Sequence, residues 1–149
     1  MSRVIAVLNG PNLNLLGERE PEIYGRATLQ DAEALATETA ERHGYRLDFR
    51  QSNHEGVLVD AIQELRATAS GLVINPAGFT HTSVAIHDAL ATVRAPVVEV
   101  HLSNLHRREE WRRMSHVSTV ADCVIMGCGI RGYALAIDCI AFSPRNSDD

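Results

Sequence analysis

The sequence predicts a three-layer α/β sandwich, with helices on both faces of a five-stranded parallel sheet. Apolar segments of five or six residues alternate along the chain with longer segments of helical periodicity. The first of them, Val4–Leu8, is uninterrupted, as expected for a strand buried on both faces of a parallel sheet. With 149 residues, 45% of them hydrophobic, the chain is expected to form one domain over residues 1–149.

Each element follows from a local pattern. Strands are expected at 4–8, 46–51, 71–75, 96–101 and 121–126. Helices are expected at 28–43, after Asn53, at 83–92 and at 132–141, with a short charged helical turn at 109–113. Thr28 and Asp31 have the spacing of a capping box, and Asn53 is expected to cap the second helix. Right-handed crossovers favour the flavodoxin-like strand order 2-1-3-4-5, and the polar tail from Ser143 is expected to fray.

The connection after the first strand is unusually long. It runs from Asn9 to Gly25, and the next helical pattern begins only near Thr28. A connection of this length, rich in Asn, Gly and Pro, is either functional or disordered. Because ligands bind at the carboxyl ends of strands in open parallel sheets, we interpret it as an active-site loop.

Composition excludes several functions. The chain has no lysine, since all 14 basic residues are arginine, and this excludes a lysine Schiff base and a P-loop. A net charge of −5 argues against nucleic-acid binding. No apolar run has the length of a membrane span and the start does not resemble a signal peptide, so the protein is expected to be cytoplasmic. The three cysteines form no CxxC pair and are expected to be ordinary buried thiols: Cys123, Cys128 and Cys139.

One motif resembles a dinucleotide-binding fingerprint. Gly127–Gly132 matches GxGxxG, follows a strand and opens a helix. A second strand with an acidic residue about 20 positions further on is missing, because the chain ends at Asp149. We therefore expect a tight turn and close helix packing rather than a cofactor site.

Polar side chains follow the first, third and fourth expected strands, and they are expected to converge on one cleft. Glu99 and His101 are two positions apart on a strand, so their side chains share a face. A carboxylate beside an imidazole fixes its tautomer and favours the protonated ring, which suits a general acid, although a salt bridge without catalytic role has the same spacing. The remaining candidates are Asn9, Asn12, Asn75, His81 and Ser103.

Tyr24 and Arg19 lie together in the long loop. A tyrosine pKa of about 10 is too high for a base at neutral pH, but a nearby guanidinium favours the phenolate; lowering the pKa to about 7 takes roughly 4 kcal/mol. Alternatively, Tyr24 anchors the loop through its ring. His81 is equally well explained as a cap of the following helix, Asp88 as part of a solvated face, and residues 107–113 as a charged surface turn.

Long motifs at these strand ends are recognisable: Gly10–Gly17, Arg19–Pro21, Tyr24–Gly25, Gln51–Gly56, Asn75–Pro76, Thr80–Ser83 and Glu99–Asn104. Together they resemble the type II 3-dehydroquinate dehydratases, from the first strand to the last helix. The resemblance implies a hydro-lyase that converts 3-dehydroquinate to 3-dehydroshikimate, in aromatic amino acid biosynthesis by the shikimate pathway or in quinate breakdown. It also implies a flavodoxin-like fold, no cofactor or metal, and a homo-oligomer, a dodecamer built from trimers. His87 and the order Ala77–Gly78 depart from the pattern common in relatives.

The resemblance also implies residue roles. Tyr24 is the base, with a pKa lowered by Arg19, and Asn12 stabilises the enolate oxygen through an ordered water. His101, oriented by Glu99, protonates the departing hydroxyl. Asp88 is expected to reach a neighbouring subunit's site and Arg108 to help the loop close, and the expected substrate contacts are Asn75, His81, Leu102, Ser103 and Arg112.

The main alternative is a flavodoxin-like ligand-binding module without catalysis. A receiver domain needs an acidic cluster after the first strand and a lysine after the fifth, and both are missing from the sequence. A flavin carrier needs a hydroxyl-rich phosphate loop where this chain has Pro11–Leu13. A catalytically inactive scaffold is disfavoured because every residue that the chemistry requires is present.

Overall fold

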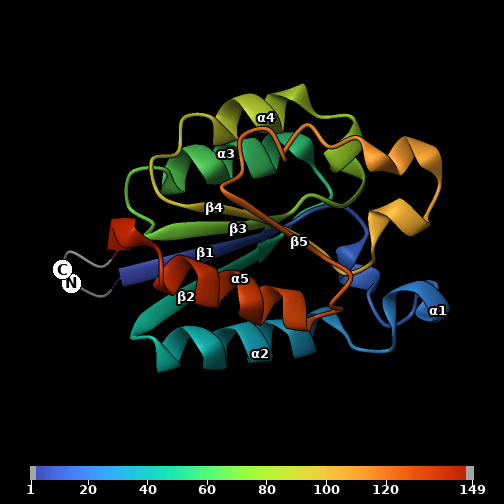
Figure 1. The fold of residues 1–149 in the computed structure, drawn as a ribbon, viewed down its shortest axis with the longest axis horizontal. Coiled ribbons are helices and arrows are strands. Elements are labelled where there is room, and N and C mark those ends of the chain that lie inside the picture. Colours follow the sequence, from blue (N-terminus) through green and yellow to red (C-terminus); the bar gives the residue numbers. More distant parts are fainter. Residues whose placement is uncertain (1–2, 147–149) are drawn as a thin grey trace.

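The computed structural model describes residues 3–146, except for the side chain of Tyr24, and it confirms the predicted sheet (Figure 1). All neighbouring strands are parallel, and their order is β2-β1-β3-β4-β5. The central strands are buried along most of their length, which explains their continuous apolar runs. The strands are β1 (Arg3–Asn9), β2 (Tyr45–Gln51), β3 (Gly71–Asn75), β4 (Val97–His101) and β5 (Cys123–Met126).

Helices cover both faces of the sheet, as Figure 1 shows. One face carries α2 (Leu29–Arg42) and α5 (Arg131–Ala141), and the other carries α3 (Glu55–Leu65) and α4 (Val84–Leu90). Each face has its own hydrophobic core cluster, the first with Ile5 and Val7 of β1 and the second with Ala6 and Leu8. This alternation follows from the two-residue period of a strand. The sandwich is therefore the predicted three-layer fold.

The loop after β1 is more structured than the sequence indicated. It contains the 3-10 helix η1 (Leu13–Leu15) and the short helix α1 (Pro21–Tyr24), where no helix was expected before Thr28. The other 3-10 helices also escaped prediction, except the turn at η4, because they are too short to show periodicity. These are η2 (Ala77–His81), η3 (Leu105–Arg107), η4 (Glu110–Arg113) and η5 (Pro144–Asn146).

One of the two predicted caps is wrong. Thr28 and Asp31 form the capping box that starts α2, as predicted. The residue before α3 is His54, not Asn53, and its side chain makes no capping bond. Asn53 instead accepts hydrogen bonds at Oδ1 from the Asn12 amide (3.0 Å) and from Nε2 of Gln51 (3.1 Å). Its side chain thus holds the loop after β1 rather than the helix.

Two further expectations are corrected. Cys128 and Cys139 are exposed and Cys123 is half-buried, because Cys128 lies in a surface turn and Cys139 lies beside the edge strand β5, where it is hydrogen-bonded to Cys123. The chain beyond Ser143 is not frayed up to residue 146: Arg145 donates to the Arg94 carbonyl and bonds the Asp122 carboxylate. The prediction for residues 147–149 lies outside the described residues.

The GxGxxG segment forms the predicted turn. Gly127 and Gly129 have φ angles of 91° and 60°, which favour glycine. Their amides donate to the carbonyls of His101 (3.2 Å) and Leu102 (3.0 Å), so the turn is tied to the end of β4. At Gly132 a Cβ would lie 3.1 Å from Cγ1 of Val100, which shows how closely α5 packs on the sheet.

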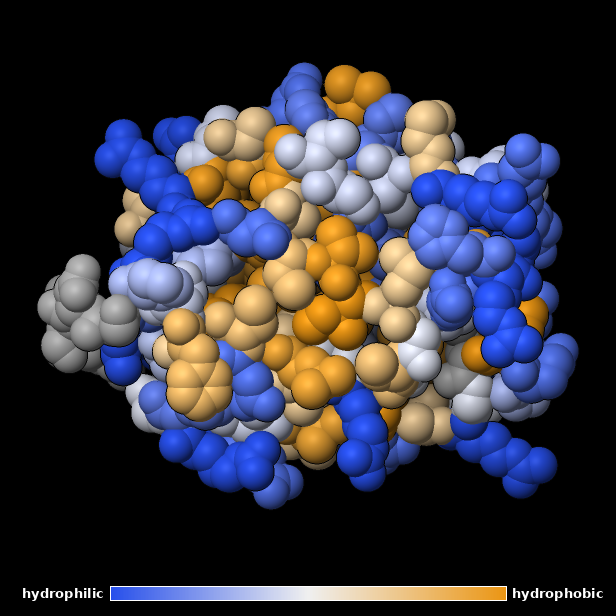
Figure 2. Space-filling model, viewed as in Figure 1, coloured by the Kyte–Doolittle hydropathy of each residue, from blue (hydrophilic) through white to orange (hydrophobic). Residues whose placement is uncertain are grey.

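Figure 2 shows apolar residues gathered near the middle of one face, surrounded by hydrophilic side chains. Exposed apolar side chains on β5 and α5 are Val124 and Leu135.

None of the helices within residues 3–146 has the length and apolar composition of a membrane span.

Candidate active site

The carboxyl ends of β1, β3 and β4 meet at a cavity of 260 Å³, as the sequence predicted. This volume lies just below the range of about 300–1,000 Å³ typical of drug-sized ligands, so the cavity suits a small molecule. A larger groove of 700 Å³ lies between α3 and α4, but no strand-end residue lines it. We therefore assign the candidate site to the smaller cavity, whose predicted lining residues are Asn12, Arg19, Asn75, His81, His101, Leu102, Arg108 and Arg112.

Backbone contacts hold the first two strand-end loops together. The Gly10 amide donates to the Asn75 carbonyl at 2.8 Å, just beyond the last paired residues of β1 and β3. A Cβ on Gly10 would lie only 2.4 Å from the carbonyl oxygen of Pro76, so this approach requires glycine. Asn12 follows in a left-handed conformation, with φ of 70° and its amide bonded to Asn53. The loop that carries Asn12 is thereby fixed against the sheet edge.

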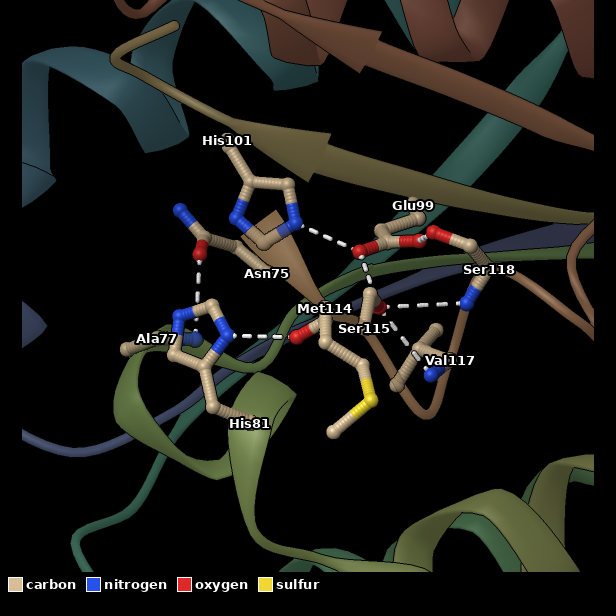
Figure 3. Close-up of polar contacts among 9 residues, drawn as sticks. All are labelled: Asn75, Ala77, His81, Glu99, His101, Met114, Ser115, Val117 and Ser118. Atoms are coloured by element: carbon tan, nitrogen blue, oxygen red, sulfur yellow. Dashed lines mark hydrogen bonds and ion pairs between the residues drawn. The ribbon is translucent and has the colours of Figure 1, made fainter. Parts of the chain in front are cut away.

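Glu99 and His101 form a buried pair at the end of β4 (Figure 3). Oε2 of Glu99 lies 2.5 Å from Nε2 of His101, and the two side chains are 1% and 5% exposed. Burial raises the pKa of the Glu99 carboxyl, but hydrogen bonds from His101, Ser118 and Ser115 outweigh it and hold this pKa below its ordinary value. Glu99 is therefore an ionised acceptor that bonds Nε2 of His101. Because His101 lines the cavity, its other ring nitrogen, Nδ1, is the one left to contact a ligand.

His81 does not cap α4, because Ser83 does so by accepting from the Ile86 amide. Instead, Nδ1 of His81 donates to the Met114 carbonyl at 2.7 Å. Burial, with help from the nearby Arg112 charge, lowers the pKa of His81 despite that hydrogen bond. A neutral ring with its proton on Nδ1 leaves Nε2 as an acceptor for a ligand hydroxyl.

Asn75 is oriented from behind the cavity by a buried network. Its Nδ2 donates to the hydroxyl of Tyr133 at 3.1 Å, and its Oδ1 accepts from the Ala77 amide at 3.3 Å. The Tyr133 hydroxyl in turn donates to Oδ1 of Asn9 at 2.6 Å. Tyr133 is fully buried, and burial raises the pKa of its hydroxyl far above the ordinary value. The network fixes the orientation of both side-chain amides, and of these two residues Asn75 lines the cavity.

Cationic side chains also line the cavity. Arg112 lies over the Trp111 ring with its Cζ 4.2 Å from the ring centroid, and Nε bonds the Glu109 carboxylate. Trp111 also makes an edge-to-face contact with His81, with ring centroids 5.7 Å apart. Arg19 and Arg108 line the same cavity. Three guanidinium groups around so small a space favour an anionic ligand, and a carboxylate matches their donor geometry.

Three of the predicted residues, Asp88, Ser103 and Asn9, do not line this cavity. Asp88 is exposed on α4, bonds His87 at 2.8 Å and lines the groove between α3 and α4. Ser103 follows Leu102 at the end of β4 but does not line the cavity. The Tyr24 backbone ends α1, while its side chain lies outside what the structure describes, so its role as base stays a prediction.

Three residues of the site were missed in the sequence. Ser115 and Ser118 donate to Glu99, and Tyr133 bonds the amides of Asn9 and Asn75. Their partners lie 16 to 124 positions away in the chain, so no local spacing could have revealed them.

Comparisons with known proteins identify the family of the chain. A model of the family described as dehydroquinase class II matches residues 3–141. The chain belongs to this family. It is 62% identical over 138 residues to a 3-dehydroquinate dehydratase of Streptomyces avermitilis, which covers 92% of this chain and 87% of the relative. A 3-dehydroquinate dehydratase of Rhodopseudomonas palustris is 58% identical, over 95% of this chain and 94% of the relative.

Solved structures of the dehydroquinase family share the fold. A type II dehydroquinase from Propionibacterium acnes superimposes with a TM-score of 0.91 at 42% identity, covering 96% of this chain and 99% of that one. The family and the enzyme class, a hydro-lyase, are therefore those that the sequence motifs indicated.

Proposed function

We propose that this protein removes water from 3-dehydroquinate to give 3-dehydroshikimate, as an enzyme of the shikimate pathway or of quinate breakdown. The observation that carries the proposal is the buried Glu99–His101 pair beside a small cavity with three arginines. The substrate is a small carboxylate with a ketone and several hydroxyls, so it needs cationic groups, amide donors and one acid. Family membership supports the same substrate.

In the proposed mechanism the elimination proceeds through an enolate. Tyr24, with its pKa lowered by Arg19, removes the proton next to the ketone, and Asn12 stabilises the enolate oxygen through a water molecule. The enolate then collapses, and the bond to the β-hydroxyl breaks. His101 donates its Nδ1 proton to that hydroxyl, which leaves as water. Glu99 stabilises the imidazolium before the transfer and keeps Nε2 protonated after it.

The remaining lining residues are proposed to bind the substrate. Asn75, the acceptor Nε2 of His81 and Arg112 would bind substrate hydroxyls. Backbone amides of Leu102 and Ser103, with the Ser103 hydroxyl, would hold the carboxylate. Arg108 would help the loop that carries Arg19 and Tyr24 to close over the substrate.

A further part of the proposal is assembly. Asp88 lies on the outer surface of α4, away from the cavity of its own chain. This placement is what a contribution to a neighbouring subunit's site requires, and it supports the proposed trimer and the dodecamer built from trimers. Sedimentation velocity tests the assembly, and a monomeric active enzyme would contradict it.

The function is tested by mixing purified, chelator-treated protein with 3-dehydroquinate and following ultraviolet absorbance of the conjugated enone product. We expect the absorbance to rise rapidly. Protein that has been treated with borohydride in the presence of substrate, which would trap an imine, is expected to show the same rise. Tyr24→Phe and His101→Gln are expected to fold and to lose turnover. Tyr45→Phe is the matched control, because Tyr45 begins β2 at the opposite end of the sheet. A flat trace from folded wild-type protein would leave the alternative of a binding module.

A further inference from the structure

The segment Met114–Ser118, between η4 and β5, runs beside the Glu99–His101 pair, and two of its serines point toward Glu99 (Figure 3). Oγ of Ser115 lies 2.8 Å from Oε2 of Glu99, the same oxygen that bonds His101. Oγ of Ser118 lies 2.5 Å from the other oxygen, Oε1. Both oxygens of the buried carboxylate are therefore held by this one segment.

The direction of the Ser115 hydroxyl follows from its other partners. Its oxygen accepts hydrogen bonds from the amides of Val117 and Ser118, each at 3.1 Å. A hydroxyl has one proton and two lone pairs, and these two amides occupy the lone pairs. The proton must therefore be donated to Glu99, so the loop fold itself requires an acceptor at Oε2.

The same segment is anchored to η2, the 3-10 helix that follows β3. The His116 amide donates to the Thr80 carbonyl at 2.9 Å, and the Met114 carbonyl accepts from His81. Two serine hydroxyls thus reach Glu99 from a backbone that is fixed against the cavity wall. A side chain that approaches a buried carboxylate in this way controls how strongly the carboxylate attracts its remaining proton donor.

We propose that Ser115 and Ser118 are positioning residues for the elimination: they hold Glu99 as an ionised acceptor, so that His101 presents Nδ1 to the substrate and releases its proton readily. The reaction assumed is the one proposed above. Two hydroxyl donors spread the carboxylate charge, which weakens its attraction for the imidazolium. Without them the Glu99–His101 pair would retain its proton more tightly and transfer it more slowly.

Other charges near the pair do not depend on the serines. The titratable and charged groups that face it across the cavity are His81 on η2, Arg112 on η4, Arg108 after η3 and Arg19 in the loop after β1. A serine-to-alanine change leaves all of these in place. A shift in pH dependence would then report the lost hydrogen bond to Glu99.

Ser118→Ala is the decisive variant, because Ser118 is exposed and its hydroxyl bonds only Glu99 among the described residues. Hydrogen bonds to charged groups are worth about twice those between neutral groups. We expect the basic limb of the kcat profile to move up by about 0.5–1 pH unit and kcat at pH 7 to fall about 3- to 10-fold, with KM little changed. Ser118→Thr keeps the hydroxyl and is expected to restore the profile.

Thr119→Ala is the matched control. Thr119 neighbours Ser118, and its hydroxyl donates to the His116 carbonyl at 3.3 Å rather than to Glu99. This variant is expected to keep the wild-type profile. Ser115→Ala is expected to shift the limb in the same direction as Ser118→Ala, with an additional loss of stability because two loop amides lose their acceptor.

Nitrogen-15 NMR of the His101 ring, assigned by its loss in His101→Gln, gives a readout that needs no substrate. We expect the ring titration to move to higher pH in Ser118→Ala and in Ser115→Ala. Superimposable titrations and pH profiles in wild type and both variants would overturn the proposal. If wild-type protein failed to dehydrate 3-dehydroquinate, the proposed reaction would fall, whereas the NMR comparison would still decide whether the serines control the proton of this pair.

Discussion

Gly10→Ala tests whether the contact between the first two strand-end loops builds the site. The new Cβ would lie 2.4 Å from the Pro76 carbonyl oxygen, whereas ordinary van der Waals contact begins at 3.4 Å. The backbone at residue 10 must therefore retreat by about 1 Å from Pro76, which breaks the bond from its amide to the Asn75 carbonyl. Overpacking of about 1–3 kcal/mol and a lost hydrogen bond of about 1 kcal/mol together give a destabilisation of about 2–4 kcal/mol.

The same displacement affects catalysis, because Asn12 is two residues further along the loop and Asn75 lies opposite. A shift of about 1 Å in positioning groups is expected to lower kcat/KM about 100-fold. Urea unfolding measures the stability and the dehydration assay measures the activity. Gly56→Ala is the control, since a Cβ there meets nothing within 4 Å and alanine favours the helix α3. Wild-type stability and activity in Gly10→Ala would refute the reasoning.

Three other substitutions have expected outcomes. Ala77 has φ of 51°, where glycine is less strained, so Ala77→Gly is expected to raise the free energy of unfolding by about 0.5 kcal/mol in urea titrations; a loss would contradict this. Tyr133→Phe leaves the amides of Asn9 and Asn75 without their buried partner and is expected to destabilise the protein by about 1–3 kcal/mol. Unchanged stability would contradict this expectation. The Glu99 carboxyl has a lowered folded-state pKa, so its contribution to stability is present above the ordinary value of 4.5 and is lost as pH falls through the folded value. Glu99→Gln should therefore make the unfolding free energy fall less steeply as the pH is lowered below about 5, and an equally steep fall would count against this.

Predictions from the sequence succeeded where the interacting residues are close in the chain. The Thr28–Asp31 capping box and the Glu99–His101 pair depend only on the geometry of one helix turn and one strand. Asn53 has the residue type of a helix cap, but its oxygen is used by Asn12, 41 positions away. That competition is invisible in a local pattern.

Surface placement was equally hard to predict for the cysteines. Cys139 has apolar neighbours in the chain and is hydrogen-bonded to Cys123 of β5, yet it is exposed because β5 is the edge strand of the sheet. Cys128 lies between two glycines whose positive φ angles create the turn after β5. Ser115 and Ser118 contact Glu99 from a segment without regular structure, so no periodicity indicates that they belong to the site.

The position of Tyr133 has a consequence for biosynthesis of the protein. Chains emerge from the ribosome N-terminus first, and α5 follows all five strands in the sequence. Until α5 has emerged and docked, Asn9 and Asn75 lack the hydroxyl that orients them, although the strands that carry them were made earlier. A nascent chain therefore carries all five strands before it can have an ordered binding site, because the hydroxyl that orients the two amides arrives with the last helix.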